Sequence, residues 1–152
     1  MTVALSLIAT SSAGSRTSAD HATPAGATWN LGKELLANAR GAHANPFPDT
    51  YGNADVWHLM GASSTARTPS TYKDLAAFAD TVCGTTGLSR WSVSDVAPEV
   101  MINTTNAAIN GLSCAPSVKL APSVANLHPG PAPVDVLVAW KSPISGTRSR
   151  AA

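Results

Sequence analysis

Tryptophan is the residue type in this chain whose numbers suggest a binding chemistry. There are four tryptophans but only two phenylalanines and two tyrosines, and an aromatic face can stack on the apolar face of a sugar ring. Trp140 shares its strand face with valines and Trp57 lies in a segment that is apolar on both sides, so we expect both in the core. Trp91 stands beside Arg90 and turn residues, so it is the tryptophan that we expect to be exposed. The sequence therefore predicts a ligand-binding surface formed by Trp91, Arg90 and Trp29, with polysaccharide as the leading ligand.

A second candidate site lies in residues 45–55, where turn-forming residues alternate with oxygen-bearing side chains. Asp49, Asn53 and Asp55, together with turn carbonyls, could ligate a structural calcium ion, a hard cation that takes roughly six to eight oxygen ligands. The alternative, which the density of turn formers favours, is that these side chains cap their own turns.

The two cysteines, Cys83 and Cys114, form a third candidate pair. In an exported protein an even number of cysteines favours a disulfide. Closing a loop of this length would stabilise the fold by roughly 3–4 kcal/mol. The alternative is two buried thiols.

Catalytic motifs are missing from the sequence. Its histidines lie far apart and show no zinc-binding spacing, and the chain has neither the nucleophile elbow of hydrolases nor a glycine-rich nucleotide-binding loop. Nothing in the spacing of the nine carboxylates indicates a glycosidase pair. We therefore expect a protein that is not an enzyme and that needs no cofactor beyond the calcium considered above.

Charge and hydropathy narrow the classes of partner. The ten basic residues are scattered, with a net charge of +1, so the basic patch of a nucleic-acid-binding protein is missing. No apolar run approaches the roughly 20 residues that a membrane span needs. Residues 1–15 are apolar and then small, as in a secretory signal, but they lack its positive start; they are either a remnant signal or an unstructured leader. We expect a secreted or cell-surface protein.

Short strands must position these side chains. Charged residues make up only 12% of the chain, and 11 glycines and 11 prolines supply many turns, which is typical of β proteins. The clearest strand is predicted over residues 134–141, where Val134, Val136, Val138 and Trp140 occupy one face. Further β segments are predicted at residues 55–60, 91–93, 100–105 and 118–127, so the fold class is mostly β, similar to a β-sandwich or jelly roll.

One or two short helices complete the prediction. Thr68 as N-cap and Pro69 at the first helical position are followed by apolar residues at helical spacing up to Val82, which predicts a helix that ends at Gly84. Residues 31–40 could form a second helix, but the glycines within and after this segment oppose it, and both alternatives stay open.

Three segments resemble a known type of domain. They are Thr28-Trp-Asn-Leu-Gly, the residues 45–57, and His128-Pro-Gly-Pro followed by residues 138–146. Together they resemble an extracellular bacterial β-sandwich module, similar to the galactose-binding and carbohydrate-binding jelly rolls of secreted proteins. We expect a signal-like or disordered leader over residues 1–26, a β-sandwich-like domain over residues 27–146 and a flexible tail over residues 147–152. The alternating strands, the signal-like leader, the tryptophans and the missing catalytic motifs favour a non-catalytic extracellular binding or accessory module.

The sequence departs from this module after its last predicted strand. In such modules further strands follow the strand that is similar to residues 134–141, whereas here a short tail follows. An incomplete sandwich would leave an unpaired edge strand, so we expect self-association through that edge. The alternative function is a scaffold fragment of a larger secreted hydrolase or surface protein.

Overall fold

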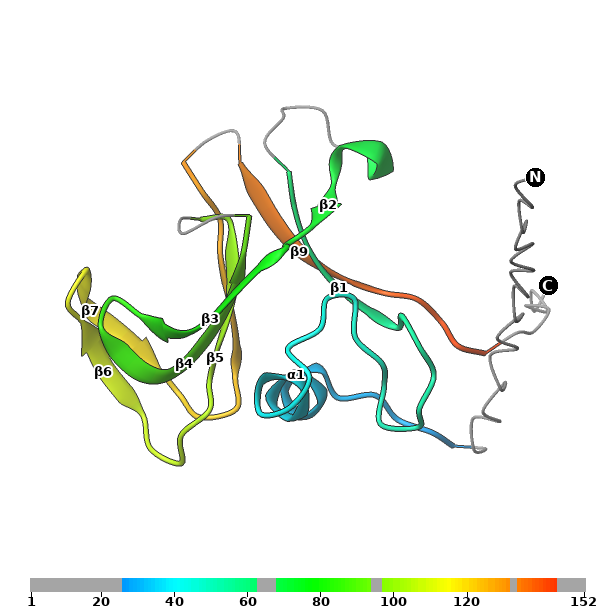
Figure 1. Ribbon diagram of the computed structural model, residues 1–152, viewed down its shortest axis with the longest axis horizontal. Helices are drawn as coiled ribbons and strands as arrows, with labels where there is room; N and C mark the ends of the chain where they lie inside the picture. The colour runs from blue at the N-terminus through cyan, green and yellow to red at the C-terminus, as the bar shows by residue number, and fades with distance from the viewer. Residues whose placement is uncertain (1–25, 63–67, 94–96, 132–133, 145–152) are drawn as a thin grey trace, which may run out of the picture.

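Two antiparallel sheets and one helix enclose the main core (Figure 1). The computed structural model describes residues 26–62, 68–93, 97–131 and 134–144. The first sheet has the strand order β2-β1-β9 and the second has the order β3-β4-β5-β8, while β6 and β7 form a separate hairpin. The elements in chain order are α1 (Leu31–Ala39), β1 (Trp57–Ala62), the 3-10 helix η1 (Pro69–Thr71), β2 (Lys73–Asp74), β3 (Ala77–Val82), β4 (Thr85–Ser92), β5 (Glu99–Asn103), β6 (Ile109–Leu112), β7 (Ala115–Leu120), β8 (Ala125–His128) and β9 (Asp135–Trp140). The predicted mostly β, sandwich-like fold is confirmed.

Strand β9 forms where its alternating pattern predicts it. It pairs with β1 along its whole length, from Ala62 opposite Asp135 to Trp57 opposite Trp140. Val136 and Val138 pack against the main core, as their shared face requires. The prediction that Trp140 belongs to this core is wrong, because Trp140 lies at the end of an edge strand and remains 43% exposed.

The main core lies between the two sheets and is covered by α1. It includes Leu59 of β1, Trp91 of β4, Ile102 of β5 and Leu35 of α1, and all four side chains are buried. Figure 1 shows α1 at one end of the space between the sheets. The helix is therefore stabilised more by the apolar residues that it buries in this core than by the intrinsic helix propensity of its sequence.

Helix α1 forms despite the glycine in its first turn. Asn30 is the N-cap, and its Oδ1 accepts a 2.9 Å hydrogen bond from the backbone N–H of Lys33. Gly32 is required by packing, since a Cβ there would lie 2.6 Å from the carbonyl oxygen of Ser123. The same glycine that opposes a helix in isolation thus lets this helix approach the loop before β8.

The helix predicted from Thr68 to Val82 is wrong. Pro69 starts only the three-residue 3-10 helix η1, and the chain then becomes extended in β2 and β3. Cys83 and Gly84 both have positive φ values, 50° and 76°, and Val82 pairs with Thr85 across them, which is the geometry of a two-residue hairpin turn. The pairing of β3 with β4 provides the backbone hydrogen bonds that a helix would have formed within itself.

A smaller core lies beside the hairpin of β6 and β7. Leu88, Met101, Leu112 and Leu120 are buried there. Cys83 and Cys114 are disulfide-bonded, with their Cα atoms 5.7 Å apart, so the predicted bridge is confirmed. The disulfide ties the turn between β3 and β4 to the turn between β6 and β7.

No helix within the described part of the chain is long and apolar enough to cross a bilayer.

Candidate functional site

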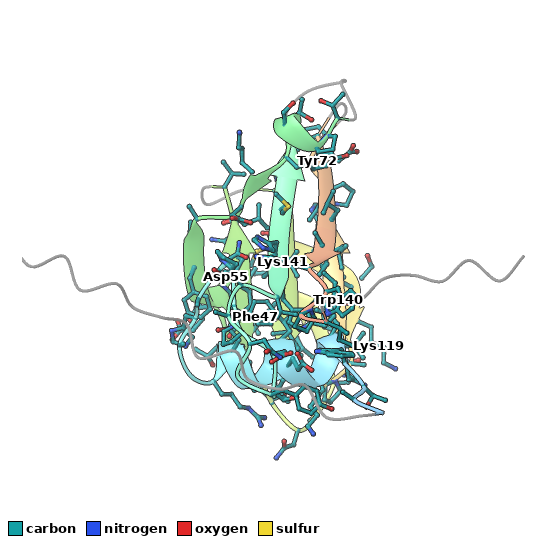
Figure 2. The ribbon with its side chains drawn as sticks, turned by 90° about the vertical axis from the view of Figure 1, so that its right-hand side faces the viewer. Phe47, Asp55, Tyr72, Lys119, Trp140 and Lys141 are labelled. Atoms are coloured by element: carbon teal, nitrogen blue, oxygen red, sulfur yellow. A yellow bond between two sulfur atoms is a disulfide. The ribbon has the colours of Figure 1, made fainter. Side chains whose placement is uncertain are left out.

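Three aromatic side chains from distant parts of the chain meet beside the end of β9. The rings of Trp29 and Trp140 lie 5.3 Å apart, and those of Trp29 and Tyr51 lie 5.7 Å apart, both edge to face. We call Trp29, Tyr51 and Trp140 the aromatic cluster. Figure 2 looks onto the side of the molecule on which Trp140 lies, with Tyr72 at the opposite end of the sheet. Edge-to-face contacts of this kind stabilise a defined ring geometry, so the cluster is a preformed surface.

Hydrogen bonds hold two of the three rings in place. The indole Nε1 of Trp29 donates to Oδ2 of Asp49 at 2.8 Å. The hydroxyl of Tyr51 accepts from the backbone N–H of Thr28 at 3.1 Å and donates to the carbonyl oxygen of the same residue at 3.2 Å. Because the polar atoms of both rings are bonded within the protein, their remaining exposed surface offers mainly an aromatic face to a ligand.

Trp140 supplies the exposed part of the cluster. Its side chain is 43% exposed, whereas Trp29 and Tyr51 are half-buried. The backbone N–H of the next residue, Lys141, donates to the carbonyl oxygen of Val56 at 2.8 Å, which continues the pairing of the two strands beyond Trp140. Trp140 is therefore presented on a fixed backbone at the end of the sheet.

Asp49 organises the turn beneath the cluster. Its buried carboxylate accepts hydrogen bonds from the backbone N–H groups of Tyr51 and Asn53, at 3.0 and 2.9 Å, and from the side-chain amide of Asn53 at 2.8 Å, besides the indole of Trp29. Burial alone would raise the pKa of Asp49, but these hydrogen bonds stabilise the ionised form, and the pKa is lowered overall. Asp49 is thus an ionised anchor for the turn.

Two of the three residues predicted to bind calcium are bonded to each other, and the third lies exposed. Asp49 and Asn53 bond to each other, whereas Asp55 is exposed with a positive φ of 54°. This arrangement is that of side chains capping their own turn, the alternative that the sequence favoured. Within the described ranges, no group of three or more histidines, cysteines or acidic residues could hold a metal ion.

The surface predicted around Trp91 and Arg90 is wrong. Trp91 is only 1% exposed, and its Nε1 donates to the carbonyl oxygen of His43 at 3.2 Å. Nη1 of Arg90 lies 3.5 Å from Oε2 of Glu99 on the neighbouring strand, and most of both side chains is buried. The physical reason is that Trp91 lies on the face of β4 that packs into the main core, where its ring lies 5.1 Å from that of Phe78. Of the three predicted ligand-binding residues, only Trp29 lies in the aromatic cluster.

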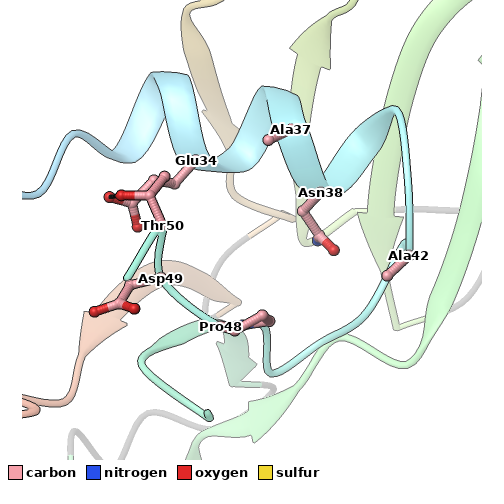
Figure 3. A pocket seen from close by; sticks show the side chains of 7 residues that line it. All are labelled: Glu34, Ala37, Asn38, Ala42, Pro48, Asp49 and Thr50. Atoms are coloured by element: carbon pink, nitrogen blue, oxygen red, sulfur yellow. Dashed lines mark hydrogen bonds between the residues drawn. The ribbon is translucent and has the colours of Figure 1, made fainter. Parts of the chain in front are cut away.

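A pocket of about 230 Å³ lies beside the aromatic cluster, between α1 and the segment that precedes Tyr51 (Figure 3). Its buried polar residues are Glu34, Asn38 and Asp49, and its exposed rim consists of Ala37, Ala42, Pro48 and Thr50. Glu34 and Asn38 lie on one face of the helix, four positions apart. The pocket thus combines an apolar rim with a carboxylate-bearing interior.

Glu34 is the carboxylate that sequence reasoning missed. Its Oε2 accepts from the indole Nε1 of Trp57 at 2.5 Å, and its Oε1 lies 3.5 Å from the hydroxyl of Thr50. The side chain is 4% exposed. No local motif marks it, because its partner Trp57 is 23 positions away. Tyr51 was missed for a similar reason, since only its packing on Trp29 distinguishes it from a turn residue.

Comparisons of the chain with protein-family models, with curated proteins and with solved structures found no match.

Proposed function

We propose that this protein is a non-catalytic carbohydrate-binding module of a secreted bacterial protein, and that the aromatic cluster is its binding surface. The observation that carries this proposal is the exposed ring of Trp140 held edge to face against Trp29. Aromatic faces attract the C–H-rich faces of sugar rings, and a rigid platform loses little entropy when it binds.

The composition and the disulfide support the extracellular part of the proposal. Disulfides persist in oxidising compartments and are rare in reducing ones, and Cys83 and Cys114 join two hairpins of this domain. The low share of charged residues, 12%, also fits a surface that binds neutral polymers more than nucleic acid.

The engagement of both pocket carboxylates supports a binding role instead of hydrolysis. A glycosidase needs one carboxylic acid with a raised pKa to protonate the leaving group. The pKa of Asp49 is lowered, and both Asp49 and Glu34 accept an indole N–H. These two side chains position tryptophans and keep the turn and helix together.

Affinity electrophoresis in gels that contain single polysaccharides tests the proposal. We expect at least one neutral polysaccharide to retard the wild-type protein, and we expect Trp140→Ala to remove at least nine-tenths of this retardation while Trp140→Phe, which retains a ring, restores part of it. Tyr72→Ala is the matched control, since Tyr72 is a half-buried aromatic residue at the opposite end of the sheet. An unchanged mobility of Trp140→Ala on every polysaccharide, or release of reducing sugars by the wild type, would contradict the proposal.

A scaffold role within a larger secreted hydrolase or surface protein is the second candidate. It is favoured by the edges of both sheets, since β8 and β9 each pair on one side only among the described residues. Val124 and Leu127 are exposed beside the first of these edges. Replacing both by serine should lower any concentration-dependent association in light scattering and leave polysaccharide retardation unchanged. A protein that is monomeric at all concentrations would remove the support for association through this edge.

A further inference from the structure

We infer that the pocket beside α1 holds a single neutral sugar unit, a chain end or a branch, of the polysaccharide that contacts the aromatic cluster. This inference rests on the proposed function and specifies the ligand of the same site. It assigns a role to Glu34, Asn38 and Thr50, which the aromatic cluster does not use.

The pocket and the aromatic cluster share one turn of the chain. Asp49 lines the pocket, and its carboxylate also bonds the indole of Trp29. Thr50 forms part of the rim, and the next residue, Tyr51, packs against Trp29. The aromatic cluster and the pocket are therefore neighbours, joined through residues 49–51.

The course of the chain bounds the pocket at two ends. Residues 40–45 reverse the direction of the chain after α1, and Asn38 closes this turn by bonding both backbone groups of Ala44, at 2.8 and 3.0 Å. Ala42 of this turn bounds one end of the pocket, and the contact between Glu34 and Thr50 spans the gap between helix and loop at the other (Figure 3). A space bounded at these two ends favours a terminal or branching unit over the middle of a polymer chain.

The size of the pocket fits one ring. Its volume of about 230 Å³ lies below the roughly 300–1,000 Å³ that is typical of sites for drug-sized ligands. Ala37, Ala42 and Pro48 offer apolar surface to the C–H face of a sugar. The pocket is therefore large enough for a monosaccharide unit and too small for a longer segment.

The carboxylates select a neutral sugar. The two oxygens of a carboxyl group offer about four acceptor positions, and Glu34 uses two of them, one for Trp57 and one for Thr50. Sugar hydroxyls can donate to the others. Since Asp49 contributes a negative charge to the lining, a uronic acid would place like charges together and be rejected.

Saturation-transfer NMR with glucose, galactose, mannose and glucuronate as separate probes tests the inference. We expect saturation transfer to at least one neutral monosaccharide and none to glucuronate. Ala42→Leu, which fills the pocket from its exposed rim, should raise the dissociation constant of that sugar at least tenfold. The matched control Ala108→Leu enlarges an exposed alanine beside the β6–β7 hairpin and should change nothing.

The variants separate this inference from the proposed function. Trp140→Ala should abolish polysaccharide retardation but keep the monosaccharide signal, since Trp140 does not line the pocket. If Ala42→Leu binds the monosaccharide as the wild type does, or if no monosaccharide binds while the polysaccharide does, the pocket assignment is overturned and the aromatic cluster stands. If glucuronate binds as well as the neutral sugar, the assigned charge selectivity is overturned.

Discussion

Trp29 donates its indole N–H to Oδ2 of Asp49 at 2.8 Å, across 20 positions of the sequence. A second indole, that of Trp57, donates in the same way to Glu34 across 23 positions. The two contacts fasten the segment before α1 to the turn at residues 49–53 and fasten α1 to β1. They place the aromatic cluster and the pocket on one rigid body, which is the property that a ligand platform needs.

The hydrogen bonds to Asp49 predict an acid-sensitive stability. The pKa of this carboxyl is lowered in the folded state, because its hydrogen bonds outweigh the opposing effect of burial. A lowered pKa contributes stability above the unfolded value of about 3.9, and that contribution is lost as the pH falls through the folded value. We expect Asp49→Asn to lower the free energy of unfolding by about 1–3 kcal/mol at pH 7 and by progressively less as the pH falls below the unfolded value.

Urea unfolding at pH 7, 4 and 3 measures this effect. Asp55→Asn is the matched control, since Asp55 is exposed beside the same turn, and we expect it to follow the wild type at each pH. A constant difference between the wild type and Asp49→Asn over this range would show that the carboxylate is not what stabilises the turn.

The hydrogen bonds of the Asn103 side chain predict that its truncation lowers the free energy of unfolding strongly. It is fully buried, and its side-chain amide donates to the carbonyl oxygens of Ala107 and Leu120 at 2.8 and 3.0 Å, while its Oδ1 accepts from the backbone N–H of Thr105 at 2.9 Å. Asn103→Ala leaves these groups without their partner, at a cost of about 2–4 kcal/mol. Thermal unfolding checks this, with the exposed Asn106→Ala as control; equal melting temperatures for the two variants would refute it.

The disulfide predicts a redox-dependent stability. Cys83 and Cys114 close a loop with a sequence separation of 31, and the loss of such a bridge costs about 3–4 kcal/mol in the chain-entropy model. We expect the double variant Cys83→Ser and Cys114→Ser to unfold at a correspondingly lower urea concentration. Reductant should destabilise the wild type to the level of this variant and leave the variant unchanged, and a wild type that is indifferent to reductant would contradict the assignment.

The close packing around Gly61 predicts that a larger side chain there destabilises the fold. A Cβ at this position of β1 would lie 2.6 Å from Cγ of Pro98, just before β5, and 3.1 Å from Cδ2 of Leu75. Gly61→Ala should therefore cost about 1–3 kcal/mol through overpacking. The free energy of unfolding in urea provides the measurement, and a variant as stable as the wild type would mean that β1 and the segment before β5 are not packed in this way.

The strands of this protein were the most predictable part of its structure. Alternation of Val134, Val136 and Val138 predicts a strand because side chains in extended backbone point to opposite faces in turn, and β9 forms there. The segment from Thr68 to Val82 shows the limit of such patterns. Its apolar spacing fits a helix, but the turn at Cys83 and Gly84 brings it against β4, and pairing across that turn decides its conformation.

The candidate site depended on tertiary structure in a way that no local pattern reveals. Trp91 and Trp140 both lie on strands, yet Trp91 is buried because it packs into the main core, while Trp140, the last residue of the edge strand β9, lies beyond that core. By itself the sequence determined the β class and the alternating strand, because these follow from local periodicity and residue type, but it left the bridge between Cys83 and Cys114 open against two buried thiols. Only the tertiary structure decided which aromatic rings meet at the surface, because exposure depends on which side chains the packing of the sheets and the helix covers.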